Sequence, residues 1–322
     1  MSGSGSAPRQ TGTRLRVGVV GVGHLGRHHA RLYASFPDVE LVAVVDRDDA
    51  RARSVASEYG CDALGIVGGL VGRIDAASVA VPTAFHRAVA VELLEAGIDV
   101  LIEKPLAREL SEADAILQAA ERNERLVMVG HTERYNPAVR ALLRAVDAPR
   151  FFEIHRLAAF SARSTDIDVV LDLMIHDLDL LLELDGSEVV SIDAVGVAAL
   201  TDKVDIANAR IRFASGCVAN LTASRISAEP LRRIRLFQSR TYLSCDTGAR
   251  RVERYRLVIG AGGAPSIEHD DLPVEPGEPL ALELAAFAQA VRTRERPWID
   301  GSKARRALEL AHRVRDACAS RP

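Results

Sequence analysis

Short apolar runs alternate with longer segments of mixed polarity over the first 130 residues. The compact apolar runs predict five strands, at 15–20, 41–45, 77–81, 100–102 and 126–129. The segments between them predict four helices, at 26–36, 49–59, 85–96 and 111–123. Ser111 is the expected N-cap of the last helix. Strands that alternate with helices in this way indicate βαβ units around a doubly wound parallel sheet, so residues 14–130 are expected to form a Rossmann domain.

The pattern changes beyond residue 150. One strongly apolar helix is expected at 168–184, and strands are then expected at 189–199, 205–213, 218–224, 234–237 and 255–259. Within 205–213 apolar and polar residues alternate, which is typical of a half-buried strand in an antiparallel sheet. Two helices, at 278–292 and 303–319, close the chain on either side of a turn-rich segment. Residues 131–322 are therefore expected to form an α+β domain, which makes the whole chain an α/β protein of two domains.

The composition of the chain gives no indication of a nucleic-acid or membrane partner. The chain has 322 residues, a length that suits about two domains, and 48% hydrophobic with 26% charged residues is ordinary for a globular protein. A net charge of -3 gives no electrostatic reason to expect nucleic acid. The first 13 residues lack the apolar stretch of a secretory signal and are expected to be a disordered tail. No later run reaches 18 apolar residues, so no membrane span is expected.

The four cysteines, which are Cys61, Cys217, Cys245 and Cys318, have no short pairwise spacing. Neither a zinc cage nor a disulfide framework is therefore indicated, and a reducing cytoplasm fits this usage. These observations together predict a cytoplasmic protein whose partner is a small molecule.

A glycine motif follows the first expected strand and opens the first expected helix, with the sequence Gly21-Val22-Gly23-His24-Leu25-Gly26. In this context the first glycine permits a tight turn, and the second lets backbone amides approach a pyrophosphate. The third allows close packing of helix and strand, and the helix N-terminus adds partial positive charge. The motif therefore predicts a bound dinucleotide.

Asp46 ends the second expected strand, twenty residues after Gly26. A carboxylate at this place accepts hydrogen bonds from the adenosine ribose and repels a 2′-phosphate, which favours NAD over NADP. Arg47 leaves some ambiguity, because its guanidinium can stack on adenine or pair with a phosphate. His28 and His29 lie on the first helix, where a solvated position or one at the edge of the core is the default expectation.

Two further motifs carry a family resemblance. Glu103-Lys104-Pro105 follows the fourth expected strand, and Val81-Pro82-Thr83 with His86 follows the third. Together with the glycine motif, the run from Gly130 to Pro137 and the closing segment 297–310, they resemble the Gfo/Idh/MocA family of glucose–fructose oxidoreductase and inositol dehydrogenase.

This resemblance implies that the nicotinamide is held in a cleft between the domains. It also implies a C-terminal domain whose large open sheet serves oligomer contacts, hence a homodimer or homotetramer. Lys104 would orient and polarise the reacting hydroxyl while Glu103 and Pro105 shape its loop. Val81, Pro82, Thr83, His86, Glu103 and Lys104 would then join the glycine motif, Asp46 and Arg47 in holding the cofactor. Read alone, the Glu-Lys-Pro tripeptide is more typical of a solvated turn than of a catalytic loop.

The expected helix at 168–184 carries one polar stripe, because its polar residues recur at helical spacing: Asp168, Asp172, His176, Asp179 and Glu183. The rest of the helix is mostly apolar, so it is expected to be buried and its carboxylates to need partners or a cleft. A carboxylate one turn from an imidazole fixes its tautomer and raises its proton affinity, which suits the base that oxidises a secondary alcohol. The resemblance gives these catalytic roles to Asp172 and His176. The alternative is a satisfied polar stripe between helices or subunits, which applies most to Asp179 and Glu183.

The same spacing offers two metal ligands, but no third is placed to complete a site, so no metal is expected. Within the family, residues 130–137 and 163–177 resemble members that oxidise the 3-hydroxyl of UDP-N-acetylglucosamine on the way to lipid A. Lys104, Asp172 and His176 would then touch the sugar, together with four further candidate contacts: Arg134, Tyr135, Asn136 and Arg163. The arginines suit a diphosphate through bidentate pairing and suit a salt bridge equally well.

Two alternatives stay open. One is an inositol or other sugar or polyol dehydrogenase, although the family's glycine-rich lead-in to the acidic helix is replaced here by Arg163 to Asp168. The other is a non-catalytic NAD-binding regulator, against which the joint presence of Lys104, Asp172 and His176 argues.

Overall fold

The computed structural model describes residues 14–160, 167–260 and 263–319. Contacts divide the chain into two compact units. Unit 1 comprises Met1–His131 and Leu280–Arg305, and unit 2 comprises Thr132–Pro279 and Arg306–Pro322. The sequence had placed a boundary after residue 130, whereas segment Leu280–Arg305 is grouped with the first unit rather than with the second. Among the described residues, no helix combines the length and the apolar character needed to cross a bilayer.

Unit 1 is built on a six-stranded parallel sheet with the order β3-β2-β1-β4-β5-β6. Its strands are β1 Leu15–Val20, β2 Val39–Val45, β3 Asp62–Leu64, β4 Ala76–Val79, β5 Asp99–Glu103 and β6 Val127–Gly130. The chain leaves β1 towards β2 and later returns to β4 on its other side. In open parallel sheets a ligand binds at the carboxyl ends of the strands beside such a reversal.

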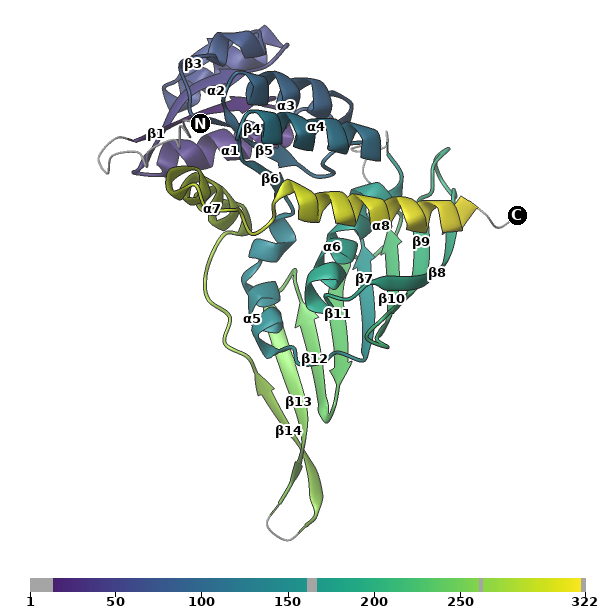
Figure 1. Ribbon diagram of the computed structural model, residues 1–322. Coiled ribbons are helices and arrows are strands. Elements are labelled where there is room, and N and C mark those ends of the chain that lie inside the picture. Colours follow the sequence, from purple (N-terminus) through teal and green to yellow (C-terminus); the bar gives the residue numbers. More distant parts are fainter. Residues whose placement is uncertain (1–13, 161–166, 261–262, 320–322) are drawn as a thin grey trace, which may run out of the picture. The chain divides into compact units, whose positions relative to one another are not determined.

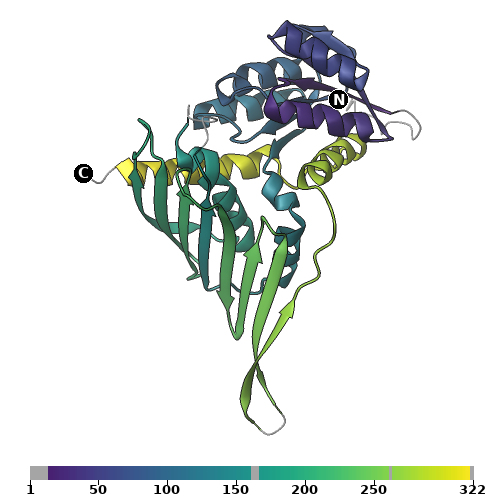
Figure 2. The ribbon, with the colours of Figure 1, turned by 180° about the vertical axis from the view of Figure 1, so that it is seen from behind.

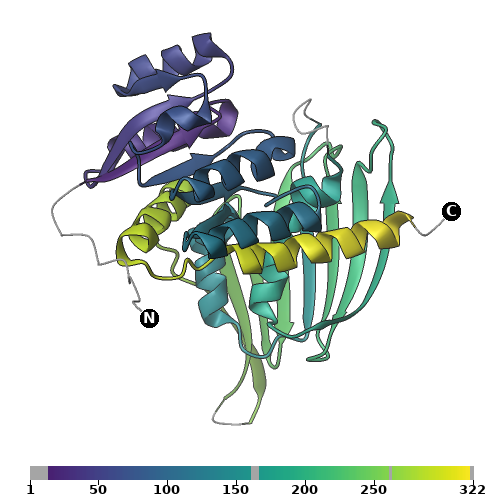
Figure 3. The ribbon, with the colours of Figure 1, turned by 45° about the horizontal axis from the view of Figure 1, so that its top comes forward.

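Helices cover both faces of this sheet, with α1 and α2 together on one side and α3 and α4 together on the other (Figure 3). These four helices are α1 His24–Ser35, α2 Asp49–Tyr59, α3 His86–Glu95 and α4 Leu110–Arg122. The unit also contains two short 3₁₀ turns, η1 Val67–Leu70 and η2 Thr83–Phe85, and the later helix α7 Pro279–Thr293. The predicted Rossmann architecture is confirmed. The prediction of Ser111 as an N-cap was wrong: Glu109 is the N-cap of α4, and the Glu112 carboxylate accepts its backbone amide at 3.4 Å.

Unit 2 contains an eight-stranded sheet with the order β14-β13-β12-β11-β7-β10-β9-β8. Its strands are β7 Phe151–Leu157, β8 Val189–Val197, β9 Ile206–Phe213, β10 Val218–Ser224, β11 Leu231–Gln238, β12 Thr241–Asp246, β13 Arg251–Ile259 and β14 Pro265–Asp271. All neighbouring strands are antiparallel except β7 and β10. The expected mainly antiparallel sheet is therefore confirmed.

Helices cover only one face of this second sheet. The elements are η3 Thr132–Tyr135, α5 Pro137–Ala145, η4 Val170–Met174, α6 Ile175–Leu184 and the last helix α8 Gly301–Ala319. Helices α5 and α6 lie on the face turned to the viewer in Figure 1. Seen from behind in Figure 2, the opposite face carries no helix of the described chain. The buried core of the unit, with Phe152, Ile154, Ile234 and Leu236 at its centre, thus lies on the helix side.

Candidate active site

The glycine motif forms a tight turn. At two of its three glycines, a Cβ atom would collide with neighbouring backbone. Gly21 has a φ of 84°, and a Cβ on it would lie 2.8 Å from the carbonyl oxygen of Ala80. A Cβ on Gly26 would lie 1.8 Å from the carbonyl oxygen of Gly21. Gly23 differs, because no described atom lies within 4 Å of the place its Cβ would take. The loop is therefore tightly packed behind Gly21 and Gly26 and open at Gly23, where a pyrophosphate needs to approach.

The N-terminus of α1 is suited to an anion. Among the described residues no side chain caps this helix end, and its first turn has no acidic residue. The first amides of a helix have no partner within the helix and carry partial positive charge. A cavity of about 620 Å³ adjoins this end, lined by Val22, Gly23, His24, Arg27, His28, Arg51, Ser54 and Val55. His24 and Leu25, two residues of the predicted motif, are exposed here.

Asp46 lies directly after β2 and is 7% exposed. Its Oδ2 accepts the amide of Val22 at 3.0 Å, and its Oδ1 accepts the amide of Asp48 at 2.9 Å. Arg51 of α2 lies 3.3 Å from both carboxylate oxygens. The carboxylate thus fixes the glycine loop to the end of β2, and ribose hydroxyls can reach its oxygens by replacing the two long contacts with Arg51. Arg47, the ambiguous neighbour, is exposed.

Glu103 ends β5 beside a cis Lys104–Pro105 bond. Its carboxylate is buried, and its Oε1 lies 2.9 Å from Nε2 of His29 on α1. Burial alone would raise the pKa of Glu103, but the hydrogen bond with His29 and the neighbouring positive charges of His29 and Lys104 lower it. Gly130 of β6 gives room to this carboxylate, since a Cβ there would lie 3.1 Å from Oε1. Lys104 itself is half-buried.

His86 is the first residue of α3 and is 1% exposed. Its Nδ1 lies 3.0 Å from the carbonyl oxygen of Pro105, and its Nε2 lies 2.9 Å from that of Val81. Burial lowers the pKa of this imidazole. The ring predicted to contact the cofactor is therefore engaged by the protein backbone. Pro82 is exposed in this loop, and Val81 and Thr83 are half-buried.

Asp172 and His176 lie on one helical segment of unit 2, at the place where its geometry changes. The segment Val170–Met174 is a π-helix, and the regular α-helix begins at Ile175. Asp168 starts the segment by accepting the amides of Val170 and Leu171 at 2.9 and 3.0 Å. Asp172 and His176 are both half-buried. Wide turns of this kind inside helices occur frequently at functional sites.

The rest of the polar stripe has a different environment. Asp179 is 1% exposed and forms an ion pair with Arg134 of η3, which Glu183 also contacts. Asp177, on another side of α6, pairs with the buried Arg156 of β7 at 2.7 Å. Within the stripe, Asp172 and His176 thus remain the catalytic prediction, whereas Asp179 and Glu183 both contact Arg134.

The four further predicted sugar contacts differ in their surroundings. Arg134 is used in the buried ion pair, so the salt-bridge alternative describes it. Asn136 caps α5 by accepting the amide of Ala138 at 3.1 Å, and it donates to the carbonyl oxygen of Thr247 at 2.9 Å. Tyr135 is 5% exposed. Arg163 lies outside the described residues.

His29 is the residue that the sequence did not single out. The default for it was a solvated position or the edge of the core, but it is fully buried against Glu103. The two residues are 74 positions apart, and nothing in the local pattern of either one indicates the other. Lys104 and its partners belong to unit 1, and Asp172 and His176 belong to unit 2.

Comparison with known proteins places this geometry in a family. The family described as an oxidoreductase family with an NAD-binding Rossmann fold matches residues 15–131, and the GFO/IDH/MocA C-terminal domain matches residues 146–249. UDP-N-acetylglucosamine 3-dehydrogenase of Acidithiobacillus ferrooxidans is 43% identical over 307 residues, covering 94% of this chain and 97% of that protein. The chain belongs to the Gfo/Idh/MocA family of oxidoreductases.

A less similar family member and a solved structure extend this comparison. Inositol 2-dehydrogenase of Rhizobium meliloti is 27% identical over 92% of this chain and 94% of its own length. A solved structure of the Acidithiobacillus ferrooxidans enzyme is 42% identical and superposes with a TM-score of 0.88, over 94% of this chain and 97% of the other. The cofactor of the chain is NAD, and the turn at Gly21, the open approach at Gly23 and the carboxylate of Asp46 fit it.

Proposed function

We propose that this Gfo/Idh/MocA oxidoreductase uses NAD to oxidise the 3-hydroxyl of UDP-N-acetylglucosamine to a ketone. The observation that carries the proposal is the 43% identity, over 94% of the chain, with an enzyme named for this reaction. Asp172 in the π-helical turn and His176 in the first turn of α6 are both half-buried, and they are a carboxylate and an imidazole of the types that the chemistry requires.

The roles of the side chains follow from the needs of alcohol oxidation. When bound, NAD accepts the hydride from the carbon that bears the hydroxyl. A ring nitrogen of His176 takes the hydroxyl proton, and the carboxylate of Asp172 stabilises the resulting imidazolium. The ammonium of Lys104 donates to the hydroxyl oxygen and orients it. Among the predicted sugar contacts, we retain Tyr135 and Arg163 and assign Arg134 and Asn136 to the framework of unit 2.

The test mixes purified protein with NAD and UDP-N-acetylglucosamine and follows NADH by its absorbance, with a carbonyl-trapping reagent present because ketone formation can be unfavourable at equilibrium. NADH formation with the nucleotide sugar and none with myo-inositol supports the proposal. NADH with inositol alone would reassign the substrate. Binding of NAD without turnover of any sugar or polyol would identify a non-catalytic sensor instead.

We also propose that a second copy of the chain covers the helix-free face of the sheet in unit 2. On this face an aromatic row crosses four strands, with ring centroids 4.8 Å apart for Phe237 and Tyr242, 5.2 Å for Tyr242 and Tyr255, and 4.4 Å for Tyr255 and His269. Exposed apolar side chains such as Ile259 and Ile267 extend it. A row of this size is more apolar than a surface in contact with water normally is.

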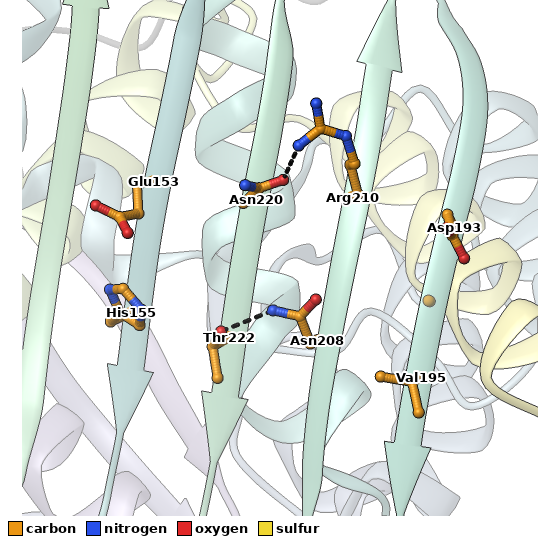
Figure 4. Close-up of a pocket in the computed structure, with 9 residues that line it drawn as sticks. Glu153, His155, Asp193, Val195, Asn208, Arg210, Asn220 and Thr222 are labelled. Carbon is orange, nitrogen blue, oxygen red and sulfur yellow. Dashed lines mark hydrogen bonds between the residues drawn. The ribbon is translucent and has the colours of Figure 1, made fainter.

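The centre of the same face is polar and carries charges of both signs. Figure 4 shows a cavity of about 390 Å³ there, lined by side chains from β7, β8, β9 and β10. Arg210 donates to Asn220 at 2.8 Å, and Asn208 donates to Thr222 at 2.9 Å (Figure 4). Glu153 and Asp193 supply the negative charge. Because a twofold contact brings the same patch to both partners, a patch with both signs can complement itself.

Light scattering after gel filtration tests this contact. We expect a dimer or a tetramer for the parent, and smaller species for Tyr242→Glu, which places a charge in the middle of the aromatic row. Ile66→Glu, which also replaces an apolar side chain by a charged one but at a 73% exposed position of unit 1, is the matched surface control. A parent that elutes as a monomer would contradict the proposal.

NAD and UDP-sugars are cytoplasmic metabolites, so the proposed reaction also implies a cytoplasmic protein.

A further inference from the structure

The loop that carries Lys104 is attached to the rest of unit 1 on both of its sides. The residue before the lysine, Glu103, is bonded through its carboxylate to Nε2 of His29 at 2.9 Å. The residue after it, Pro105, is bonded through its carbonyl oxygen to Nδ1 of His86 at 3.0 Å. Both imidazoles are buried, with 0% and 1% of their surface exposed. Two buried histidines from two different helices therefore flank one half-buried lysine.

We propose that His29 and His86 are positioning residues that together set the direction of the Lys104 side chain. The proposal rests on the role given above to Lys104 and adds two residues that touch neither sugar nor reacting atoms. Positioning of this kind has catalytic value because a displacement of a catalytic group by about 1 Å can cost a factor of about 100 in rate.

The two histidines come from helices that begin near the expected dinucleotide site. His29 lies on α1, the helix whose N-terminus follows the glycine loop. His86 starts α3, and its Nε2 lies 2.9 Å from the carbonyl oxygen of Val81, in the loop after β4. A neutral imidazole has one N–H, so the bond to Pro105 requires the tautomer with the proton on Nδ1, in which Nε2 does not donate to Val81. The Lys104 loop is thus connected to the glycine helix through His29 and to the start of α3 through His86. The elements expected to hold the dinucleotide consequently fix the lysine as well.

The geometry of the two contacts makes a crossed substitution test possible. The amide nitrogen of glutamine stands in for Nε2 of histidine, and that of asparagine stands in for Nδ1. His29 contacts Glu103 through Nε2, whereas His86 contacts Pro105 through Nδ1. We therefore expect His29→Gln and His86→Asn to keep Lys104 in place, and His29→Asn and His86→Gln to release it. All four variants are neutral amides of similar polarity, so burial of a polar group does not distinguish them.

The lysine content of the chain provides a direct readout. The sequence contains three lysines, Lys104, Lys203 and Lys303. Reductive methylation with ¹³C-formaldehyde labels the three lysines and the α-amino group for NMR. Lys203→Arg and Lys303→Arg assign the two lysine signals that are not of interest, and the α-amino signal is recognised by its lower pKa. In the parent we expect the Lys104 signal to be displaced from that of an exposed lysine. In His29→Asn and His86→Gln this signal moves towards the exposed position or broadens, while the other two stay.

Turnover and binding complete the experiment. With the preferred sugar, His29→Asn and His86→Gln are expected to lower kcat by about tenfold or more, and calorimetric NAD affinity is expected to change by less than about twofold. Tyr33→Phe is the matched control, because Tyr33 is a buried neighbour on α1 whose hydroxyl bonds Ser78 at 2.9 Å and not the lysine loop. Its Lys104 signal should equal that of the parent.

Two results would overturn the proposal. One is a Lys104 signal that is the same in the parent and in both disruptive variants. The other is the reverse order within a pair, or equal effects of Gln and Asn at both positions, which would indicate that the histidines only fill space. The NMR measurement requires no sugar, so a failure of UDP-N-acetylglucosamine as substrate leaves it fully interpretable.

Discussion

Arg134 and Asp179 form a buried bidentate ion pair, in which Nε lies 2.6 Å from Oδ2 and Nη2 lies 2.8 Å from Oδ1. Each residue is 1% exposed. Burial alone would lower the pKa of Arg134, but Asp179 and Glu183 outweigh it and raise the pKa. The pair joins η3 to α6, the helix that carries His176. Arg134 therefore fixes this helix against η3.

Replacing Arg134 by methionine should destabilise unit 2. The substitution leaves Asp179 as a buried charge without its partner, and loss of one member of a buried pair costs about 3–5 kcal/mol. Urea unfolding followed by circular dichroism measures the effect as a lower midpoint. Arg144→Met is the control, because Arg144 is 53% exposed and lies 3.9 Å from Glu275, a geometry that contributes about 0–1 kcal/mol. Unchanged stability together with a higher KM for the nucleotide sugar would show instead that Arg134 binds substrate.

Replacing Asp46 by serine should change the choice of cofactor. Hydrogen bonds to a charged group contribute about 1.5–3 kcal/mol, so loss of the carboxylate should weaken NAD binding by roughly tenfold to a hundredfold. NADP should gain relative to NAD, because the repulsion of its 2′-phosphate disappears while Arg51 remains nearby. Calorimetric titration with both cofactors gives the ratio. Asp49→Ser, an exposed residue in the first turn of α2, should leave it unchanged.

The alternation of apolar runs and helical segments was enough to predict the fold of unit 1, because its strands are buried on both faces and its helices are amphipathic. β3 escaped prediction because it has only three residues, none of them fully buried. In unit 2 the five expected strands correspond to β8, β9, β10, β11 and β13, but β7, β12 and β14 were not predicted. β7 places Arg156 on the core face, where Asp177 neutralises it, and β14 is an exposed edge strand rich in polar residues. Tertiary pairing at one position and the lack of burial at the other hide the usual pattern.

The candidate site was predictable where chemistry requires a local motif. The glycine turn and Asp46 act through neighbours within one βαβ unit, so their spacing along the chain carries the information. His29 and Glu103 meet only after the sheet has formed, and the same holds for Arg134 and Asp179. The prediction that Arg134 and Asn136 contact the substrate followed residue type, and both side chains make contacts within unit 2 that sequence spacing does not reveal.

His176→Ala should lower kcat by about a hundredfold to ten-thousandfold, the range for loss of a general base, with NAD affinity unchanged. Asp172→Asn should show a smaller loss, because the imidazole remains but no longer has a carboxylate to stabilise its charged form. Steady-state kinetics and calorimetric titration with NAD separate the two quantities. Parallel loss of turnover and of NAD binding in both variants would mean that these residues maintain the fold.

Asp205 organises the chain that leads into the π-helical turn. Its carboxylate accepts the amides of Leu200 and Thr201 at 2.7 and 2.8 Å, and it pairs with Arg225 at 2.9 Å. Arg225 in turn donates to the carbonyl oxygen of Ile167 at 2.7 Å, close to the start of the segment with Asp172. Burial alone would raise the pKa of Asp205, but these amides and the guanidinium lower it.

A carboxyl whose pKa is lower in the folded than in the unfolded chain stabilises the fold above its unfolded pKa, about 3.9 for aspartate, and loses this effect as the pH falls. Asp205→Asn should therefore lower Tm by a constant amount above about pH 5, and the difference from the parent should shrink in more acidic buffer. Thermal unfolding of both proteins over a series of pH values measures this. Asp202→Asn, an exposed neighbour, should give a curve parallel to that of the parent. A difference that grows on acidification would mean that the carboxyl of Asp205 is held protonated, and that the loop before Asp172 is anchored by packing rather than by charge.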